Sequence, residues 1–237
     1  TRKESSAASD VYKRQLMSYE FDFSFLREYM PDIWVGIQQT AWMTLVSIVP
    51  GFVLGTAAAV ARLSGPAWAR RIVTIYVEGI RNTPLVIQVF WLFFGLAVMG
   101  ARIGPFNAAV IALVINVGAY TAEIMRAGFQ SIPRGQLEAA SCLAMSRSQM
   151  FFSVQLPQAV ERVYPALVSQ FILMMLATSI MSQISANELT GVAYQIQSFT
   201  FRGFEVYLVI AVVYLALASA LRLLLHGLQW LHLLRLS

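Results

Sequence analysis

Charge is scarce in this sequence, because only 12% of its 237 residues are Asp, Glu, Lys or Arg, whereas soluble domains carry about 25%. Lysine is rarer still, since Lys3 and Lys13 are the only two. A P-loop needs a lysine beside a glycine-rich loop to hold the phosphates of ATP. The chain beyond Lys13 therefore lacks a residue that P-loop ATP hydrolysis requires.

Cysteine and histidine are almost absent as well. Cys142 is the only cysteine, which excludes an intrachain disulfide and a thiolate metal cluster. His226 and His232 are six positions apart, which does not match metal-ligand spacing on a helix. We therefore predict no metal site and interpret both histidines as interfacial side chains. The sequence also has no H-E-x-x-H or G-x-S-x-G motif, which argues against an intramembrane hydrolase.

Apolar residues make up 58% of the chain. A membrane-spanning helix needs about 20 mostly apolar residues. Uncharged runs of this kind cover residues 33–61, 82–101, 103–122 and 163–187, and a fifth, 206–225, contains only Arg222 near its end. The sequence predicts an all-α integral membrane protein with five transmembrane helices, in which residues 33–237 form a single transmembrane domain.

The segments between these runs differ in charge. Residues 17–32 hold four acids and one base, whereas the first loop between spans holds three arginines and no acid. Positive loops stay in the cytoplasm, so we expect 17–32 to be external, the loop over 126–162 cytoplasmic, the loop over 183–203 external and the C-terminus cytoplasmic. The same arginines explain the basic pI without nucleic-acid binding. Residues 1–16 precede Met17, which resembles an initiator, and are interpreted as a non-native or disordered leader.

The long cytoplasmic loop, over about residues 130–157, has a helix–turn–helix pattern. Pro133 permits a helix after it, and a narrow stripe at helical spacing follows: Leu137, Ala140, Ser141 and Ala144. Ser146 and Gln149 have capping-box spacing, which predicts a second helix after Ser146. Two short helices at the cytoplasmic surface suit docking on a partner protein, and they also suit a connector that lies on lipid.

The external loop repeats this pattern. Ser185 and Glu188 have capping-box spacing, and an apolar stripe follows at helical spacing: Leu189, Val192, Ala193 and Ile196. We predict a short helix across the outer mouth, acting either as a gate or as a packed cap.

The cytoplasmic loop resembles that of a known family, the inner-membrane permease subunits of ATP-binding-cassette (ABC) importers, in the branch for polar amino acids. The family pattern is E-A-A, three residues, G, nine residues, I-x-L-P. The matching residues here are Glu138, Ala139, Ala140, Ala144, Val154, Leu156 and Pro157, with Arg134 and Gly135 just before them. Ala144 replaces the family glycine, and alanine is disfavoured if the turn requires a positive φ.

Three further stretches resemble spans of the same branch in the same order, over residues 76–95, 116–140 and 200–218. The resemblance implies the type I permease fold, with a coupling helix between the third and fourth spans seated on a cytoplasmic ATPase. That ATPase would bind ATP and Mg²⁺, so this chain would need no cofactor and would not be an enzyme. A second permease subunit, identical or related, two ATPase subunits, an extracytoplasmic amino-acid-binding protein and the lipid of a bacterial inner membrane complete the implied assembly.

Charged residues in the second span are candidates for the transport path. Glu78 and Arg81 lie about ten residues into a helix expected to start near Arg70, close to the bilayer midplane. They can act on a substrate or simply pair with each other. Thr83 could cap a half-helix that begins at Pro84. We hypothesise that Arg81 and the Thr83 region meet the α-carboxylate of an amino acid.

The third span carries a polar stripe, since Asn116, Tyr120 and Glu123 recur on one helical face. Such a stripe lines a water-filled cavity or joins helices by hydrogen bonds.

The fourth span bears on substrate charge. In relatives that carry basic amino acids this span reads N-E-F, four residues, K-D-T-S, whereas Gln170 and Ala177 replace both acids here. A cationic side chain would then enter without a counter-ion, which is unfavourable. Gln170, Thr178 and Ser179 can form hydrogen bonds instead, which predicts an uncharged polar or acidic amino acid, unless a sister subunit holds the acids. The alternatives are a permease for another small solute and a self-contained secondary transporter or channel.

Overall fold

The computed structural model describes residues 20–234, with side chains up to residue 230, and these residues form helices without any strand. The leader proposed over 1–16, Met17, Arg235 and the side chain of His232 lie outside the described part. The elements are α2 (Phe25–Ser64), α3 (Ala67–Arg81), α4 (Leu85–Phe90), the π-helix η1 (Trp91–Gly95), α5 (Leu96–Val98), α6 (Pro105–Gln130), α7 (Arg134–Cys142), α8 (Arg147–Met150), the π-helix η2 (Phe151–Gln155), α9 (Leu156–Ala177), the 3₁₀-helix η3 (Thr178–Ile184), α10 (Leu189–Thr200) and α11 (Gly203–Leu234).

Four helical stretches among the described residues are long and apolar enough to cross a membrane: α2, α6, the stretch Arg147–Ile184 and α11. The second predicted span is the exception. It is a broken pair, Ala67–Arg81 followed by Leu85–Val98, bent by 110°. Pro84 sits at the break, where it lacks a backbone donor and disfavours helical backbone in the residue before it. The helix is therefore interrupted near Pro84, as expected for a half-helix that begins there, and counting the broken pair as one span brings the number of spans to five.

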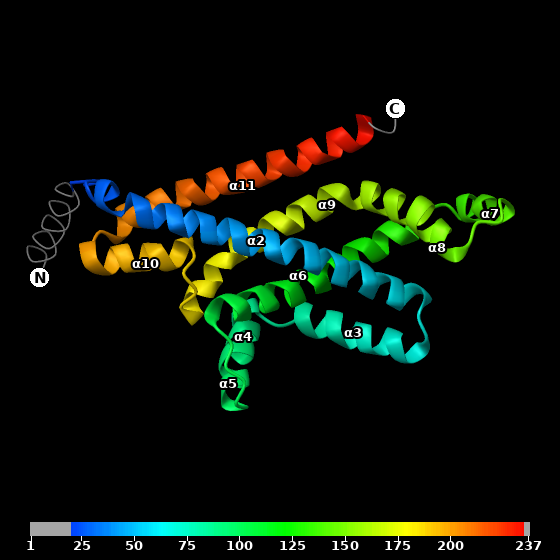
Figure 1. The fold of residues 1–237 in the computed structure, drawn as a ribbon, viewed down its shortest axis with the longest axis horizontal. Helices are drawn as coiled ribbons and strands as arrows, with labels where there is room; N and C mark the ends of the chain where they lie inside the picture. Colours follow the sequence, from blue (N-terminus) through cyan, green and yellow to red (C-terminus); the bar gives the residue numbers. More distant parts are fainter. Residues whose placement is uncertain (1–19, 235–237) are drawn as a thin grey trace, which may run out of the picture.

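The long helices lie side by side, with α6 between α2, α3 and α9 (Figure 1). Glycines permit the close approach of α2 to α6. A Cβ on Gly51 would lie 2.0 Å from Cγ1 of Val117, and one on Gly55 would lie 2.5 Å from Cβ of Thr121. Side chains at these positions would collide with α6, so the small residues of α2 determine the spacing of the two helices.

The two ends of the bundle carry different short elements (Figure 1). The end that holds α7 and α8 also holds the C-terminal ends of α2 and α11, while α10 and the beginning of α2 lie at the opposite end. The expected helix–turn–helix between the third and fourth spans is confirmed by α7 and α8. A capping box formed by Ser146 and Gln149 begins α8 as predicted.

The predicted helix of the external loop is confirmed by α10, and its apolar stripe is buried against α2 and α11. The proposed capping box is wrong, because Ser185 adopts a left-handed conformation, φ 60°, at the end of η3. Glu188 is itself the N-cap and accepts hydrogen bonds from the amides of Thr190 (2.9 Å) and Gly191 (2.8 Å). The sharp reversal after η3 places Ser185 outside the helix start. Within the described chain, α10 therefore packs against α2 and α11 and covers this end of the bundle.

The N-terminal segment is tied to this same end. Arg202 lies 3.0 Å from Asp22 and 3.4 Å from Glu205 at the beginning of α11. Hydrogen bonds from Ser24 hold the pKa of Asp22 below its usual value. The carboxylate of Asp22 therefore stays charged and keeps its bond to Arg202 over a wider pH range.

Candidate transport and coupling sites

The break between α3 and α4 is held together by side-chain hydrogen bonds. The Thr83 hydroxyl donates to the carbonyl of Gly79 (2.9 Å), at the end of α3. Gln88 of α4 donates to the Thr83 hydroxyl (2.8 Å) and to the Ile80 carbonyl (2.8 Å). Thr83 therefore does not cap α4, contrary to the sequence prediction, because its hydroxyl faces back to the carbonyls of α3. Pro84 occupies the N-cap position of α4, and no side chain there accepts a hydrogen bond from the first amides of the helix.

Gln88 was missed by the sequence reasoning. Its amide oxygen accepts a hydrogen bond from Asn116 of α6 (3.0 Å), so a chain of contacts runs from Asn116 through Gln88 to Thr83. The sequence did contain a signal for this contact, because Gln88 is a polar residue one turn after Pro84 in an otherwise apolar run. Side-chain amides in membrane spans form hydrogen bonds with neighbouring helices.

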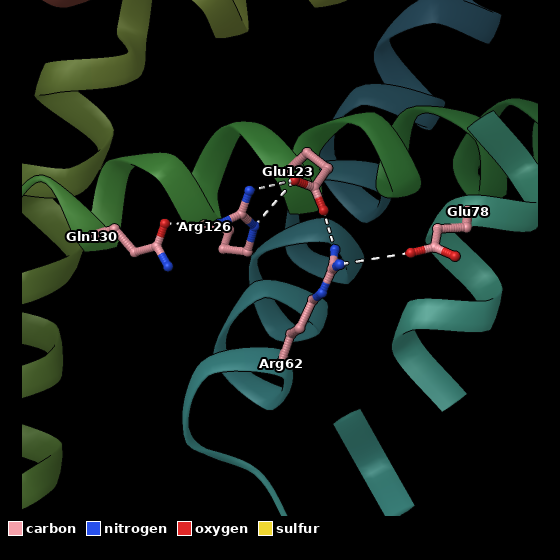
Figure 2. A network of polar contacts seen from close by, with 5 residues as sticks. All are labelled: Arg62, Glu78, Glu123, Arg126 and Gln130. Carbon is pink, nitrogen blue, oxygen red and sulfur yellow. Dashed lines mark hydrogen bonds and ion pairs between the residues drawn. The ribbon is translucent and has the colours of Figure 1, made fainter. Parts of the chain in front are cut away.

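A network of charges joins α2, α3 and α6 (Figure 2). Glu123 accepts a hydrogen bond from Arg62 and two from Arg126, at 3.0 and 2.8 Å. Arg126 also donates to Gln130 (2.7 Å). On its other side, Arg62 lies 3.9 Å from Glu78. Two arginines that the sequence suggested only as topology determinants are thus partners of the predicted site residues Glu78 and Glu123.

The predicted pair of Glu78 and Arg81 is not formed. Glu78 faces Arg62, and the guanidinium of Arg81 lies 5.4 Å from the ring centroid of Tyr120, a favourable cation–π geometry. Both side chains are exposed in the single chain. Their i, i+3 spacing allowed a pair, but α6 supplies an aromatic face to one and α2 a cation to the other.

The polar stripe of α6 faces α3, α4 and α2. Asn116 bonds to Gln88, Tyr120 lies under Arg81, and Glu123 bonds to Arg62. Each of the three predicted residues thus has a partner on another helix, which supports the helix-contact interpretation. On α3, Val77 packs with Ala58 and Ala122, and the Tyr76 hydroxyl donates to the carbonyl of Ile115 (2.7 Å), so apolar and polar contacts together hold α3 against α2 and α6.

The three predicted residues of the fourth span have different surroundings. Gln170 is half-buried, and its amide has no hydrogen-bond partner among the described residues. Ser179 is half-buried and donates to the carbonyl of Leu176 (2.7 Å). Thr178 is fully buried and donates to the carbonyl of Met175 (2.7 Å). Thr178 is therefore shielded within the chain in this conformation, and its place in the transport path stays a prediction.

The loop predicted to couple to an ATPase presents an exposed helix. Arg134, Gly135, Glu138 and Ala139 of α7 are exposed, whereas Ala140 is buried against the bundle. Leu143, after the end of α7, is 77% exposed. Leu156 is half-buried and Pro157 exposed at the beginning of α9. The exposed side of α7 and Leu143 are therefore accessible to another protein.

The turn after α7 has the positive φ at which alanine is disfavoured. Ala144 adopts φ 53°, in the left-handed region that glycine occupies at little cost. Its amide donates to the carbonyl of Ser141 (3.0 Å), and the next amide, of Met145, donates to the carbonyl of Ala140 (3.3 Å). These bonds close the helix end as a C-cap does.

Comparison with known proteins places these features in a family. The profile of the family described as binding-protein-dependent transport system inner membrane component matches residues 51–229. The chain is 36% identical over 212 residues to a glutamine transport system permease protein of Escherichia coli, covering 89% of this chain and 97% of the relative. It is 34% identical over 219 residues to an octopine transport system permease protein of Rhizobium radiobacter, covering 89% of each.

Solved structures agree with this match. A crystal structure of an amino acid ABC transporter with histidines contains a chain that is 36% identical, with a TM-score of 0.79, covering 89% of this chain and 98% of that one. A chain of an inward-facing methionine ABC transporter, 23% identical with a TM-score of 0.71 and covering 85% and 96%, shares the fold.

Proposed function

Because the chain belongs to the binding-protein-dependent transport system inner membrane components, we propose that it forms the membrane path for a polar, non-cationic amino acid such as glutamine. It is a permease subunit of an ABC importer, embedded in the inner membrane, and it works with a separate ATPase and with a binding protein. The chain is therefore not an enzyme itself.

The observation that carries the substrate proposal is Gln170. Its half-buried amide has no described partner, and it stands where relatives for basic amino acids have a glutamate. Between residues 163 and 177, α9 contains no acid. An amide can donate to and accept from an uncharged polar side chain, but it cannot neutralise a buried cation. The relative named for glutamine transport supports the same choice.

Arg81 supports recognition of the α-carboxylate. Its guanidinium is exposed at the last turn of α3, beside the break, where it lies over the ring of Tyr120 and has no hydrogen-bond partner among the described residues. A cation that stacks on a ring keeps its hydrogen-bond donors free for a carboxylate. Uptake by Arg81→Ala should therefore show a raised KM, and an unchanged KM at equal membrane abundance contradicts this role.

Coupling and assembly complete the proposal. The exposed side of α7, with Glu138 and Leu143, is the surface we assign to the ATPase. The importer contains two permease subunits, two ATPases and one extracytoplasmic binding protein, with the N-terminus of this chain outside and its C-terminus in the cytoplasm. The charges of the loops support this orientation.

Competition in reconstituted importer tests the substrate. Proteoliposomes that contain the permease, its ATPase and its binding protein should take up labelled glutamine, and excess arginine should compete weakly. Efficient competition by arginine or lysine contradicts the role of Gln170. A sister subunit with both acids in its fourth span would then account for the result, and mass spectrometry of the purified complex detects it.

A further inference from the structure

A groove of about 520 Å³ opens between α2, α9 and α11, toward the end of the bundle that carries α7. Its walls are apolar side chains of three membrane-crossing helices: Ile48 and Phe52 of α2, Val160 and Leu167 of α9, and Leu225 and Leu228 of α11. It extends along α9 from Leu156 to Phe171, about 22 Å at the rise of an α-helix. The shape suits an elongated apolar ligand.

Three polar side chains also line the groove. The hydroxyl of Tyr164 donates to the carbonyl of Leu225, which joins α9 to α11. Glu161 is exposed and Gln229 is half-buried, and neither has a hydrogen-bond or ion-pair partner among the described residues. On α9, Glu161 follows the lining residues Leu156, Pro157 and Val160 and precedes Leu167, Val168 and Phe171. The groove therefore combines an apolar channel with a carboxylate in the half nearer α7.

Glu161 precedes the uncharged run 163–187, so it is expected at the cytoplasmic edge of the span, where lipid head groups lie and a cation can approach its carboxylate. The neighbouring Arg162 does not serve this purpose, since its guanidinium donates to the carbonyl of Ser131 (2.5 Å). A cation that pairs with Glu161 therefore comes from outside the described residues. In a membrane, a molecule with an apolar chain and a cationic donor fits both parts of the groove.

We propose that the groove binds an acyl chain of a phospholipid whose head group carries a primary amine, with the ammonium at Glu161. Gln229 can donate to the phosphate or glycerol oxygens of the same lipid. The lipid would fill the space between α11 and the helices α2 and α9. Only 6% of the apolar window of α11 is buried within the chain, so most of this helix is left for lipid or another subunit to cover.

Retention of lipid by the purified importer tests the proposal without measuring transport. The complex, in detergent, is equilibrated with equal amounts of phosphatidylethanolamine and phosphatidylcholine of identical acyl chains, re-isolated, and analysed by mass spectrometry. The choline head group is a cation without hydrogen-bond donors, so the ethanolamine lipid should be retained in about threefold excess. Glu161→Gln should bring the ratio close to unity.

Two matched valines test the apolar part. Val49 lines the groove and Val53, one turn further along α2, does not, although their exposures are similar at 65% and 60%. Val49→Trp should lower the total lipid retained, and Val53→Trp should leave it unchanged. The proposal is overturned if Glu161→Gln keeps the preference, or if both tryptophan variants retain wild-type lipid. It is also overturned if Val49→Cys, in a Cys142→Ser background, forms a disulfide between two permease copies, because the partner subunit then covers the groove.

Discussion

Arg62, in the last turn of α2, donates a hydrogen bond to Glu123 of α6, although the two residues are 61 positions apart in sequence. The side chains are 26% and 19% exposed. Glu123 also binds Arg126, and Arg62 approaches Glu78 (Figure 2). A half-buried carboxylate between two guanidinium groups therefore joins α2 to α6, and Arg62 extends the network to α3.

The first prediction concerns this pair. Arg62→Gln should lower the stability of the detergent-solubilised permease, by about 1–3 kcal/mol, because Glu123 loses a charged donor in a poorly solvated position. Glu123→Gln should destabilise similarly by leaving Arg62 and Arg126 close together. The double variant should cost less than the sum of the singles, since the two residues share one interaction. Thermal unfolding measures the cycle, with Arg70→Gln, an exposed arginine of α3, as the control. Additive losses contradict direct coupling.

The second prediction concerns the approach of α2 to α6. Gly55→Ala should reduce the yield of folded permease, because the new Cβ would lie 2.5 Å from Thr121 Cβ and 2.7 Å from the carbonyl oxygen of Gly118. Overpacking of this kind costs about 1–3 kcal/mol. Gly79→Ala is the matched control, since nothing lies within 4 Å of its Cβ position. It should be neutral or stabilising. Size-exclusion profiles of the two variants compare them, and equal behaviour argues against the close contact.

The third prediction concerns the turn after α7. Ala144→Gly should be tolerated and should stabilise the turn by about 1 kcal/mol, because alanine at φ 53° bears a steric cost that glycine lacks. Ala139→Gly, on the exposed side of α7, should instead weaken the helix by about 1 kcal/mol. Ligand-stimulated ATPase activity of the reconstituted importer reports both changes. Loss of stimulation in Ala144→Gly contradicts the strained-turn interpretation.

The fourth prediction concerns coupling. Glu138→Lys should lower uptake and ligand-stimulated ATPase activity together, because it reverses a charge on the surface assigned to the ATPase, while membrane insertion stays normal. Gln136→Lys adds a cation on the same helix, also exposed, two positions away and hence on a different face. It should have the smaller effect. Equal stimulation in Glu138→Lys and wild type removes Glu138 from the coupling surface.

The fifth prediction concerns topology. In a Cys142→Ser background, a membrane-impermeant thiol reagent added from outside should label Ser198→Cys in α10 and spare Ser64→Cys at the end of α2. Both serines are exposed, so accessibility in the folded chain does not distinguish them. The reverse pattern overturns the orientation and, with it, the assignment of α7 to the cytoplasmic side.

Much of the architecture follows from local sequence pattern. The uncharged runs predicted the helical class and the number of spans, because apolar length alone makes a helix compatible with a membrane. The capping box at Ser146 and the apolar stripe of α10 could also be predicted from the sequence, because both depend on residues within two helical turns of one another. The spacing of the loop around Glu138 indicated the family, which the comparisons show.

Tertiary structure decided which residues meet. The sequence allowed Glu78 to pair with Arg81, but the fold brings Arg62 to one and Tyr120 to the other. It predicted Thr83 as a helix cap, whereas the 110° bend directs that hydroxyl back to α3. Helical periodicity states which residues share a face, but not which helix that face contacts. That partner is set by packing between distant segments, here by the glycines that let α2 lie close to α6 and so carry Arg62 to Glu123.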